Sequence, residues 1–389
     1  MTVPGWLLER LEAAGGAVPY RTFMDWVLHD PAHGAYGTGR LRIGPAGDFA
    51  TAPSLGPDFA ALLAPQLAEW LSPLAKSAPG PLALVETGPG EGSLALQLAE
   101  EFAGGWPELA VRTELVLVEP NAGMAERQRA LLQPCSMSCR WTSFAALSEA
   151  PVRGVVLAHE VLDALAVERI EWDGAFWRQQ LVVKKEGFGA QPSLRLEPGA
   201  PLAPEATGQL ETLGLLPPSP QRPPGWCTEL HPGLAPWLAD CARAVSEGQL
   251  LVIDYALEAW RYYAPQRSAG TLMAYRGQQA SGDPLQDPGC WDLTAHLCIE
   301  SVDAAARASG WQPLGQCRQG QALLALGLAE RLHRLQHQTN LAVQLSRREA
   351  LLRLVDPTAL GDFRWLAYGR GQALPSHLSP PRFLQEPGP

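Results

Sequence analysis

The sequence predicts an α/β fold with a mostly parallel sheet that carries helices on both faces. Two observations support this prediction. Four short apolar runs, at 82–85, 115–118, 155–158 and 250–253, have the composition of strands, and helical segments follow the first two. Runs that are apolar throughout are typical of strands buried on both faces, as in parallel sheets. Hydrophobic residues make up 46% of the 389 residues, which is enough for a sizeable core and excludes a wholly disordered chain.

Composition also limits the possible classes of function. The formal net charge of −10 disfavours a broad phosphate-binding surface, so we expect no nucleic-acid partner. No run of 18 apolar residues occurs, so we expect no membrane span. The seven cysteines are scattered and form no C-x-x-C pair, so we expect them to be reduced thiols in a cytosolic protein. Because Glu9 and Glu12 interrupt any apolar leader, we expect a cytoplasmic protein.

The first 80 residues are expected to be helical, with one long loop. A helix opened by Pro57 is predicted by apolar residues that recur on one face: Phe59, Leu62, Leu63, Leu67, Trp70 and Leu71. A glycine-rich loop over 33–56 precedes it, and loops of that length are usually functional or mobile. We therefore expect an N-terminal helical and lid segment over 1–80, a main domain over 81–368 and a C-terminal tail over 369–389.

The main domain is expected to contain helices over 93–102 and 122–132 and an insertion at about 167–235. Asp173-Gly174 lies between the strand-like runs 167–172 and 176–183, and this pattern predicts a β-hairpin. Residues 184–226 are rich in proline and glycine, so we expect them to be irregular. Farther along, the pattern predicts helices over 302–308 and 328–354 and a last strand over 363–368.

Acidic residues stand at the carboxyl ends of all four predicted strands. The residues at these ends are Glu86, Glu119, His159-Glu160 and Asp254-Tyr255. In an open parallel sheet, ligands bind beyond the carboxyl ends of the strands. Carboxylates buried there are costly unless a partner satisfies them, and a ligand with hydroxyls and a positive charge would do so. The alternative is that these carboxylates are merely exposed at strand ends.

A glycine-rich turn follows the first strand, at Gly88, Gly90 and Gly92. Glycine there allows the backbone to approach a ligand closely. A dinucleotide site would have a third glycine or alanine where this chain has Ser93, and Glu86 would repel a pyrophosphate. Glu119 is placed to accept from two vicinal ribose hydroxyls. A ligand with a ribose, an ammonium group and no phosphate fits this pattern best, which indicates S-adenosylmethionine rather than a nicotinamide cofactor.

The segment after the third strand, His159 to Asp163, resembles a zinc-binding H-E-x-x-H motif in part. Asp163 replaces the second histidine and the segment follows a strand, so we expect no metal site. Glu160 and Asp163 could instead hold a guanidinium group and orient its nitrogen. The alternative is that both carboxylates only complement the dipole of a following helix.

Taken in order, these motifs resemble the MidA-like family, methyltransferases related to the mitochondrial complex I assembly factor that methylates arginine. The matching segments run from about residue 20 to 368 and are 47–53, 84–92, 117–120, 159–165, 253–255, 270–276, 283–296 and 361–363. The resemblance implies a class I methyltransferase fold, which is Rossmann-like, with an N-terminal helical segment and a hairpin insertion. It also implies S-adenosyl-L-methionine as the cofactor.

The resemblance further implies roles for individual residues. The donor-binding set would be Glu86, Gly88, Gly90, Gly92, Glu119 and His159. Glu160 and Asp163 would be catalytic and face the target nitrogen. The lid and substrate residues would be Asp48, Thr51, Asp292, Thr294 and His296.

The implied substrate is an arginine of a protein partner, the 49-kDa-type subunit of respiratory complex I or its bacterial-type equivalent. The alternative function is that of a non-catalytic assembly factor that binds S-adenosylmethionine and chaperones such a subunit. The chain departs from the family at His159, where asparagine is frequent, and at Ser54, where glutamate is usual. It also has Ala166 in place of proline and Ala256 in place of glycine.

Overall fold

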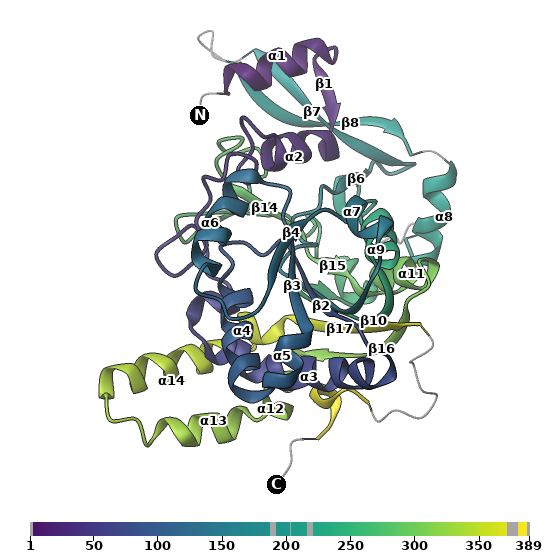
Figure 1. Cartoon of the computed structure of the whole chain (residues 1–389). Coiled ribbons are helices and arrows are strands. Elements are labelled where there is room, and N and C mark those ends of the chain that lie inside the picture. The colour runs from purple at the N-terminus through teal and green to yellow at the C-terminus, as the bar shows by residue number, and fades with distance from the viewer. Residues whose placement is uncertain (1–2, 187–191, 203, 216–220, 372–379, 387–389) are drawn as a thin grey trace. The chain divides into compact units, whose positions relative to one another are not determined.

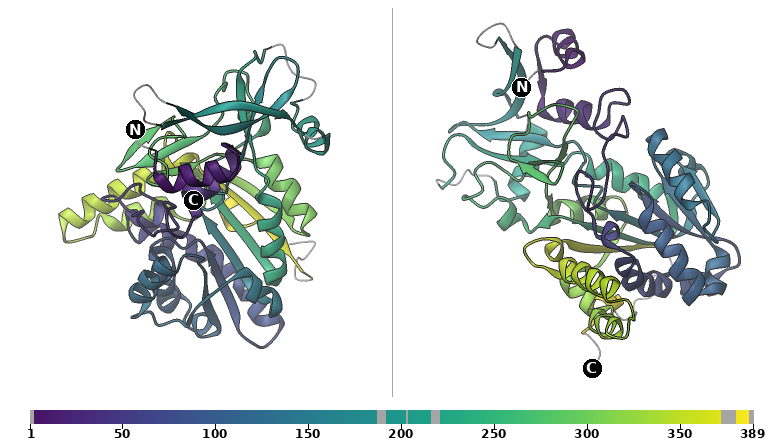
Figure 2. Two further views of the ribbon diagram at one scale, coloured as in Figure 1. Left: turned by 90° about the horizontal axis from the view of Figure 1, so that it is seen from above. Right: turned by 90° about the vertical axis from the view of Figure 1, so that its left-hand side faces the viewer.

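The computed structural model describes residues 3–186, 192–202, 204–215, 221–371 and 380–386. The chain forms two compact units, each assembled from three separate stretches (Figures 1 and 2). The sheet unit comprises Ile43–Val161, Trp237–Tyr255 and Ala305–Pro389, and the hairpin unit comprises Met1–Arg42, Leu162–Pro236 and Ala256–Ala304. Two helices pass along the chain from one unit into the other, α9 (Leu234–Ala244) and α11 (Ile299–Ala308).

The sheet unit is built on a seven-stranded sheet of order β16-β17-β10-β5-β2-β3-β4. Its strands are β2 (Leu82–Thr87), β3 (Thr113–Val118), β4 (Cys139–Thr142), β5 (Val152–His159), β10 (Val245–Asp254), β16 (Gln312–Arg318) and β17 (Arg364–Arg370). Strand β17 runs antiparallel to both of its neighbours, β10 and β16. All four predicted apolar strands are present, and they pair in parallel. The strand order reverses between β2 and β5, so the carboxyl ends of these two strands form the expected binding position.

Helices cover this sheet with apolar faces. They include η1 (Ala52–Leu55), α3 (Asp58–Ser77), α4 (Ser93–Gly105), α5 (Pro107–Arg112), α6 (Ala122–Leu132), α7 (Phe144–Glu149) and α12 (Gln319–Ala325). The face predicted for the helix after Pro57 is buried in α3, where it joins the core formed with α4 and the strands. The chain after α12 continues through η2 (Leu360–Asp362) and ends with η3 (Arg382–Leu384).

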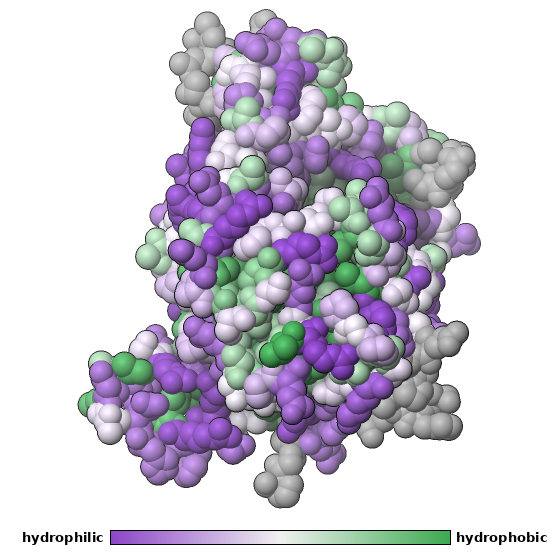
Figure 3. All heavy atoms as spheres, viewed as in Figure 1, coloured by the Kyte–Doolittle hydropathy of each residue, from purple (hydrophilic) through white to green (hydrophobic). Residues whose placement is uncertain are grey.

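The helical stretch predicted over 328–354 is two helices, α13 (Leu328–Leu335) and α14 (Leu341–Val355), which lie side by side (Figure 1). The buried carboxylate of Asp58, at the start of α3, pairs with Arg331 of α13 and Arg347 of α14. The opposite face of α14 exposes Leu341, Leu345 and Leu352. Hydrophobic and hydrophilic side chains are accordingly interspersed over this helical pair in Figure 3.

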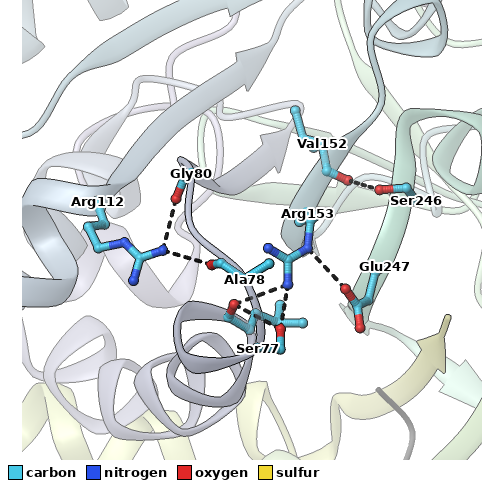
Figure 4. Close-up of polar contacts among 9 residues, drawn as sticks. Ser77, Ala78, Gly80, Arg112, Val152, Arg153, Ser246 and Glu247 are labelled. Atoms are coloured by element: carbon cyan, nitrogen blue, oxygen red, sulfur yellow. Dashed lines mark hydrogen bonds and ion pairs between the residues drawn. The ribbon is translucent and has the colours of Figure 1, made fainter. Parts of the chain in front are cut away.

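Two arginines fasten the amino-terminal edge of the sheet to the end of α3 (Figure 4). Arg112 donates to the carbonyls of Ala75, Ala78 and Gly80, at 2.7, 3.1 and 3.0 Å. Arg153, at the start of β5, donates to Leu74 O at 3.0 Å and to Glu247 Oε2 of β10 at 3.0 Å. The last carbonyls of a helix lack intrahelical partners, and these guanidinium groups supply them.

The hairpin unit contains α1 (Gly5–Ala13), β1 (Ala17–Pro19), α2 (Tyr20–His29), β6 (Glu168–Trp172), β7 (Trp177–Glu186), β8 (Pro192–Pro201), α8 (Pro204–Thr212) and β9 (Trp226–Leu230). The predicted hairpin is confirmed as β6 and β7, and the Asp173 carboxylate accepts from the backbone N–H groups of Ala175 and Phe176 at its turn. The irregular structure predicted for 184–226 is wrong, because β8 pairs with β7 and α8 follows. Prolines are tolerated in β8 because it is an edge strand, where a missing N–H need not leave a partner unsatisfied. Residues 187–191, 203 and 216–220 of that prediction lie outside the described ones.

The rest of the hairpin unit consists of short elements. They are β11 (Ala256–Leu257), α10 (Ala259–Tyr262), β12 (Met273–Arg276), β13 (Gln279–Ser281), β14 (Asp292–Thr294) and β15 (Leu297–Cys298). Strands β12, β13 and β14 form an antiparallel sheet of order β13-β12-β14. In the part of the chain that the structure describes, no helix has the length and apolar character needed to cross a membrane.

Candidate functional site

The glycine turn connects β2 to α4 in a conformation that requires glycine. Gly88, Gly90 and Gly92 have φ angles of 56°, 56° and 86°, in the left-handed region. A Cβ on Gly90 would lie 2.7 Å from Ile43 Cδ1, and one on Gly88 would lie 3.1 Å from Val161 Cγ2. The turn therefore brings bare backbone to the carboxyl end of β2, immediately before the first turn of α4.

Glu86 lies on β2, just before this turn, with 7% of its surface exposed. Its neighbours are apolar and include Leu84, Leu98 and Leu117. Burial raises the pKa of Glu86 to about 8. Among the described residues, nothing forms a hydrogen bond with its Oε2. An orphaned carboxylate oxygen is costly to bury, which indicates that a positively charged or donating group belongs beside it.

Glu119 follows β3, the strand next to β2. Its Oε1 accepts from the N–H of Asn121 at 2.8 Å, and its Oε2 accepts from Gln128 Nε2 at 3.0 Å. Burial raises the pKa of Glu119. Each carboxylate oxygen has one further lone pair, so the group can still accept two hydroxyl protons.

His159 and Glu160 lie at the carboxyl end of β5, on the other side of β2. Burial lowers the pKa of His159 to about 3, so the imidazole is neutral, and its ring contacts the edge of Phe59 at a centroid distance of 5.1 Å. The 3.5 Å separation of His159 Nδ1 and Glu160 Oε1 is therefore a polar contact rather than an ion pair. Glu160 has a φ of 54°, which is strained for a residue with a side chain.

Asp254, at the end of β10, stabilises the loop that carries Glu160. Its carboxylate accepts from the N–H of Val161 at 3.3 Å and from that of Tyr255 at 2.8 Å. The N–H of Glu160 itself donates to Ile253 O at 2.9 Å. The carboxylate of Asp254, one of the predicted acidic strand ends, therefore holds the backbone at Val161 and Tyr255 in place.

Asp48 and Thr51, which were predicted to belong to a lid, lie in the sheet unit. A β-bridge joins Ile43 and Phe49 in their segment, and Ile43 Cδ1 lies where it would clash with a Cβ on Gly90. Farther on, Ser54 Oγ donates to Thr51 O at 2.7 Å and accepts from the N–H of Thr51 at 3.0 Å. Ser54 thus shapes the local turn.

Four of the predicted site residues lie in the hairpin unit: Asp163, Asp292, Thr294 and His296. Asp292 of β14 lies opposite Tyr275 in the antiparallel ladder with β12. The backbone N–H of Ala295 donates to the Asp163 carbonyl oxygen at 3.0 Å. Burial raises the pKa of Asp163 to about 7. The pKa of Tyr275 is also raised, first by burial and then by the charges of Asp163 and Asp292. Tyr275 and Asp292 are cross-strand neighbours within electrostatic reach of Asp163, and we refer to these three residues as the acidic and aromatic cluster.

The other nine predicted residues lie in the sheet unit: Asp48, Thr51, Glu86, Gly88, Gly90, Gly92, Glu119, His159 and Glu160. Glu160 and Asp163, which were expected to act as a pair, belong to different units. Burial lowers the pKa of His296 to about 4, so this residue is neutral as well. The backbone N–H of His296 donates to Thr271 Oγ1 at 3.0 Å.

Two sets of buried polar residues in the structure were not predicted from the sequence. Gln128 of α6 contacts both the glycine turn and Glu119. A signal was present, because Gln128 lies four residues from both Met124 and Leu132 on the buried face of its helix. In the hairpin unit, Glu229 Oε2 accepts from Thr271 N at 2.9 Å and from Tyr262 OH at 3.2 Å. No motif or spacing indicated that network.

The residues of the sheet unit fit S-adenosylmethionine. Glu86 offers an orphaned carboxylate oxygen for an ammonium group, the glycine turn offers a cradle that a Cβ would fill, and Glu119 can accept from ribose hydroxyls. Among the residues that the structure describes, no group of three or more His, Cys, Asp or Glu side chains is placed to hold a metal ion.

Comparisons with known proteins agree with this geometry. Residues 62–317 match the model of a family of S-adenosyl-L-methionine-dependent methyltransferases. The chain is 28% identical over 410 residues to the mitochondrial protein arginine methyltransferase NDUFAF7 homologue of Drosophila melanogaster, covering 96% of this chain and 87% of that protein. It is 24% identical over 375 residues to the Danio rerio protein arginine methyltransferase NDUFAF7, covering 90% and 82%.

A solved structure extends the similarity to the fold. A Burkholderia thailandensis protein bound to S-adenosyl-homocysteine has a TM-score of 0.81 and 26% identity, covering 99% of this chain and 98% of that one. The predicted class I methyltransferase fold and the predicted S-adenosyl-L-methionine cofactor are thereby confirmed. The chain belongs to the family of S-adenosyl-L-methionine-dependent methyltransferases that includes its MidA-like relatives.

Proposed function

We propose that this methyltransferase modifies an arginine side chain of a protein partner. The observation that carries the proposal is the cluster of Asp163, Asp292 and Tyr275 in the hairpin unit. Its two carboxylates can accept the N–H donors of a planar guanidinium, and an aromatic ring can face the same cation. The relatives in Drosophila and Danio are protein arginine methyltransferases, which supports the same substrate.

Burial is the main cause of the raised pKa of Asp163, about 7. A bound guanidinium would lower this pKa, because an opposite charge favours the ionised form. The bound guanidinium would thereby offset part of the free-energy cost of burying the ionised carboxylate. A neutral side chain of similar size would bring no such compensation, so the cluster selects for a cation.

Methyl transfer to arginine requires the protein to orient the guanidinium group and to receive a proton from it. When bound, S-adenosyl-L-methionine supplies an electrophilic methyl group on a sulfonium. An arginine nitrogen gives up one proton for each methyl group that it gains, and arginine is protonated in water. We assign the orientation of the guanidinium to Asp163 and Asp292 of the hairpin unit. The resemblance to the MidA-like family separately implies a catalytic role for Glu160, whose carboxylate is a candidate to receive the proton.

We further propose that the partner is the 49-kDa-type subunit of respiratory complex I or its bacterial-type equivalent. The support is the ordered set of motifs shared with the MidA-like family. The test is to incubate a native lysate with the purified protein and tritiated S-adenosylmethionine, and to identify the labelled band and residue by mass spectrometry. We expect methylarginine on such a subunit, and label on lysine would contradict the arginine assignment.

Variants distinguish the enzyme from a non-catalytic assembly factor. Asp292→Asn should reduce methyl transfer at least tenfold, because the guanidinium loses a charged partner, while calorimetric binding of S-adenosylhomocysteine stays unchanged. Asp303→Asn, a substitution elsewhere in the hairpin unit, serves as the matched control. If the wild-type protein binds S-adenosylhomocysteine but labels no partner, the assembly-factor alternative is favoured.

A further inference from the structure

Gln128 is a fully buried amide in α6, with none of its surface exposed. It interrupts the otherwise apolar face formed by Met124, Ala125 and Leu132. Burying an amide costs free energy unless each of its polar atoms has a partner. A side chain that departs from the apolar pattern at such a position therefore needs a local reason.

Every polar atom of this amide has a hydrogen-bond partner. Its Oε1 accepts from Trp141 Nε1 of β4 at 3.0 Å. Its Nε2 donates to Gly90 O at 2.8 Å and to Glu119 Oε2 at 3.0 Å. The opposite amide orientation would set its NH₂ against the indole N–H and its oxygen against two acceptors, so the partners fix one orientation.

The amide thereby joins the two segments that face the donor. Gly90 belongs to the glycine turn and Glu119 follows the end of β3, and both residues lie beyond the ladder that pairs β2 with β3. Glu119 Oε1 is held separately by the N–H of Asn121 at 2.8 Å. The carboxylate is therefore fixed at both oxygens, and its remaining lone pairs have set directions.

The backbone packing keeps this connection short. A Cβ on Gly92 would lie 3.3 Å from Gln128 Cγ, so the bare turn admits the stem of the side chain. Gly92 is also the residue from which α4 begins. A longer or bulkier residue at 128 would press against the start of α4.

We propose that Gln128 is a positioning residue for the donor's ribose: it sets the Glu119 carboxylate and the Gly90 peptide so that the site selects a vicinal diol. The inference rests on the placement of the ribose at Glu119. Gln128 touches no reacting atom, and it acts through Glu119. Removing its amide deletes the hydrogen bond to Glu119 Oε2, so that the Glu119 carboxylate can rotate, and it also deletes the hydrogen bond to the Gly90 carbonyl.

The test measures binding to the protein without donor, by calorimetry, with S-adenosylhomocysteine and its 2′,3′-dideoxy analogue. The wild-type protein should bind the analogue at least tenfold more weakly. Gln128→Met keeps the volume and removes the hydrogen bonds. This substitution should weaken the binding of S-adenosylhomocysteine at least tenfold and the binding of the analogue much less. The ratio of the two dissociation constants should therefore fall to within about threefold.

Two further variants keep the outcome decisive. Trp141→Phe removes the donor that orients the amide and keeps an aromatic ring at this half-buried position, and it should reduce discrimination between the two ligands severalfold in a folded protein. Gln133→Met, on the exposed end of the same helix, should change nothing. Thermal unfolding of each variant without ligand verifies the fold.

The possible results separate the inference from the ribose placement. If Gln128→Met and Trp141→Phe weaken both ligands equally, so that the ratio persists, the residue is only structural and the proposal is overturned. If both variants bind S-adenosylhomocysteine as the wild type does, it is also overturned. If the wild-type protein fails to discriminate, the ribose does not lie at Glu119, and the placement itself is wrong.

Discussion

The strained backbone of Glu160 permits a test in which two small substitutions reverse their usual order of stability. Its φ of 54° lies in the left-handed region, where a Cβ costs about 1–2 kcal/mol. Elsewhere in regular structure, glycine is less stable than alanine by about 0.5–1 kcal/mol, because it loses more conformational freedom on folding. Glu160→Gly and Glu160→Ala both delete the same carboxylate. The difference between them therefore isolates the backbone, and we expect Glu160→Gly to be more stable by about 0.5–1 kcal/mol.

The assay is urea unfolding of the two variants without ligand, followed by circular dichroism, with equal slopes required for the comparison. Asp303→Gly and Asp303→Ala, in the helix α11, form a matched control pair in which alanine should be the more stable. Both variants at 160 should bind S-adenosylhomocysteine and fail to transfer a methyl group. If Glu160→Ala were as stable as Glu160→Gly or more so, the residue would not be held in this strained conformation.

Three other predictions concern the sheet unit. Because burial raises the folded pKa of Glu86 to about 8, the folded state binds more protons than the unfolded state above pH 4.5. The wild type should thus lose unfolding free energy relative to Glu86→Gln as pH rises from 5 to 8 in urea titrations, and parallel curves would contradict this. Since His159 is neutral with a pKa of about 3, His159→Asn should leave the pH profile of methyl transfer between 5 and 8 unchanged. Arg112→Ala removes three hydrogen bonds to carbonyls and should cost about 2–3 kcal/mol in urea unfolding without weakening donor binding in calorimetry.

The strands and helices of the sheet unit were largely predictable because each local pattern has one physical interpretation. Four runs without polar residues are best buried on both faces, and all four are consecutive parallel strands, in the order β10-β5-β2-β3. The predicted helix over 122–132 matches α6. By contrast, the irregular structure expected over 192–201 is wrong, because proline content does not exclude an edge strand.

The proposed donor-binding residues were chosen from the sequence because glycines and strand-end carboxylates are themselves sequence signals. Gln128 could not be assigned in this way, since its role depends on three partners that are distant in sequence: Gly90, Glu119 and Trp141. Glu229 is similar, because its partner Thr271 is 42 residues away. The periodicity places Gln128 on the buried face of α6, but the partners in such long-range networks follow only from the three-dimensional structure.

The hydrogen bonds of Arg112 to the segment after α3 have a consequence for introducing new chain ends there. One guanidinium group contacts carbonyls on both sides of Pro79, at Ala78 and at Gly80. A break in the backbone at this point would leave both new ends tethered to the same side chain. A circular permutant that starts at Pro79, with the original ends joined by a flexible linker, should therefore still assemble, and replacing Arg112 should abolish that tolerance.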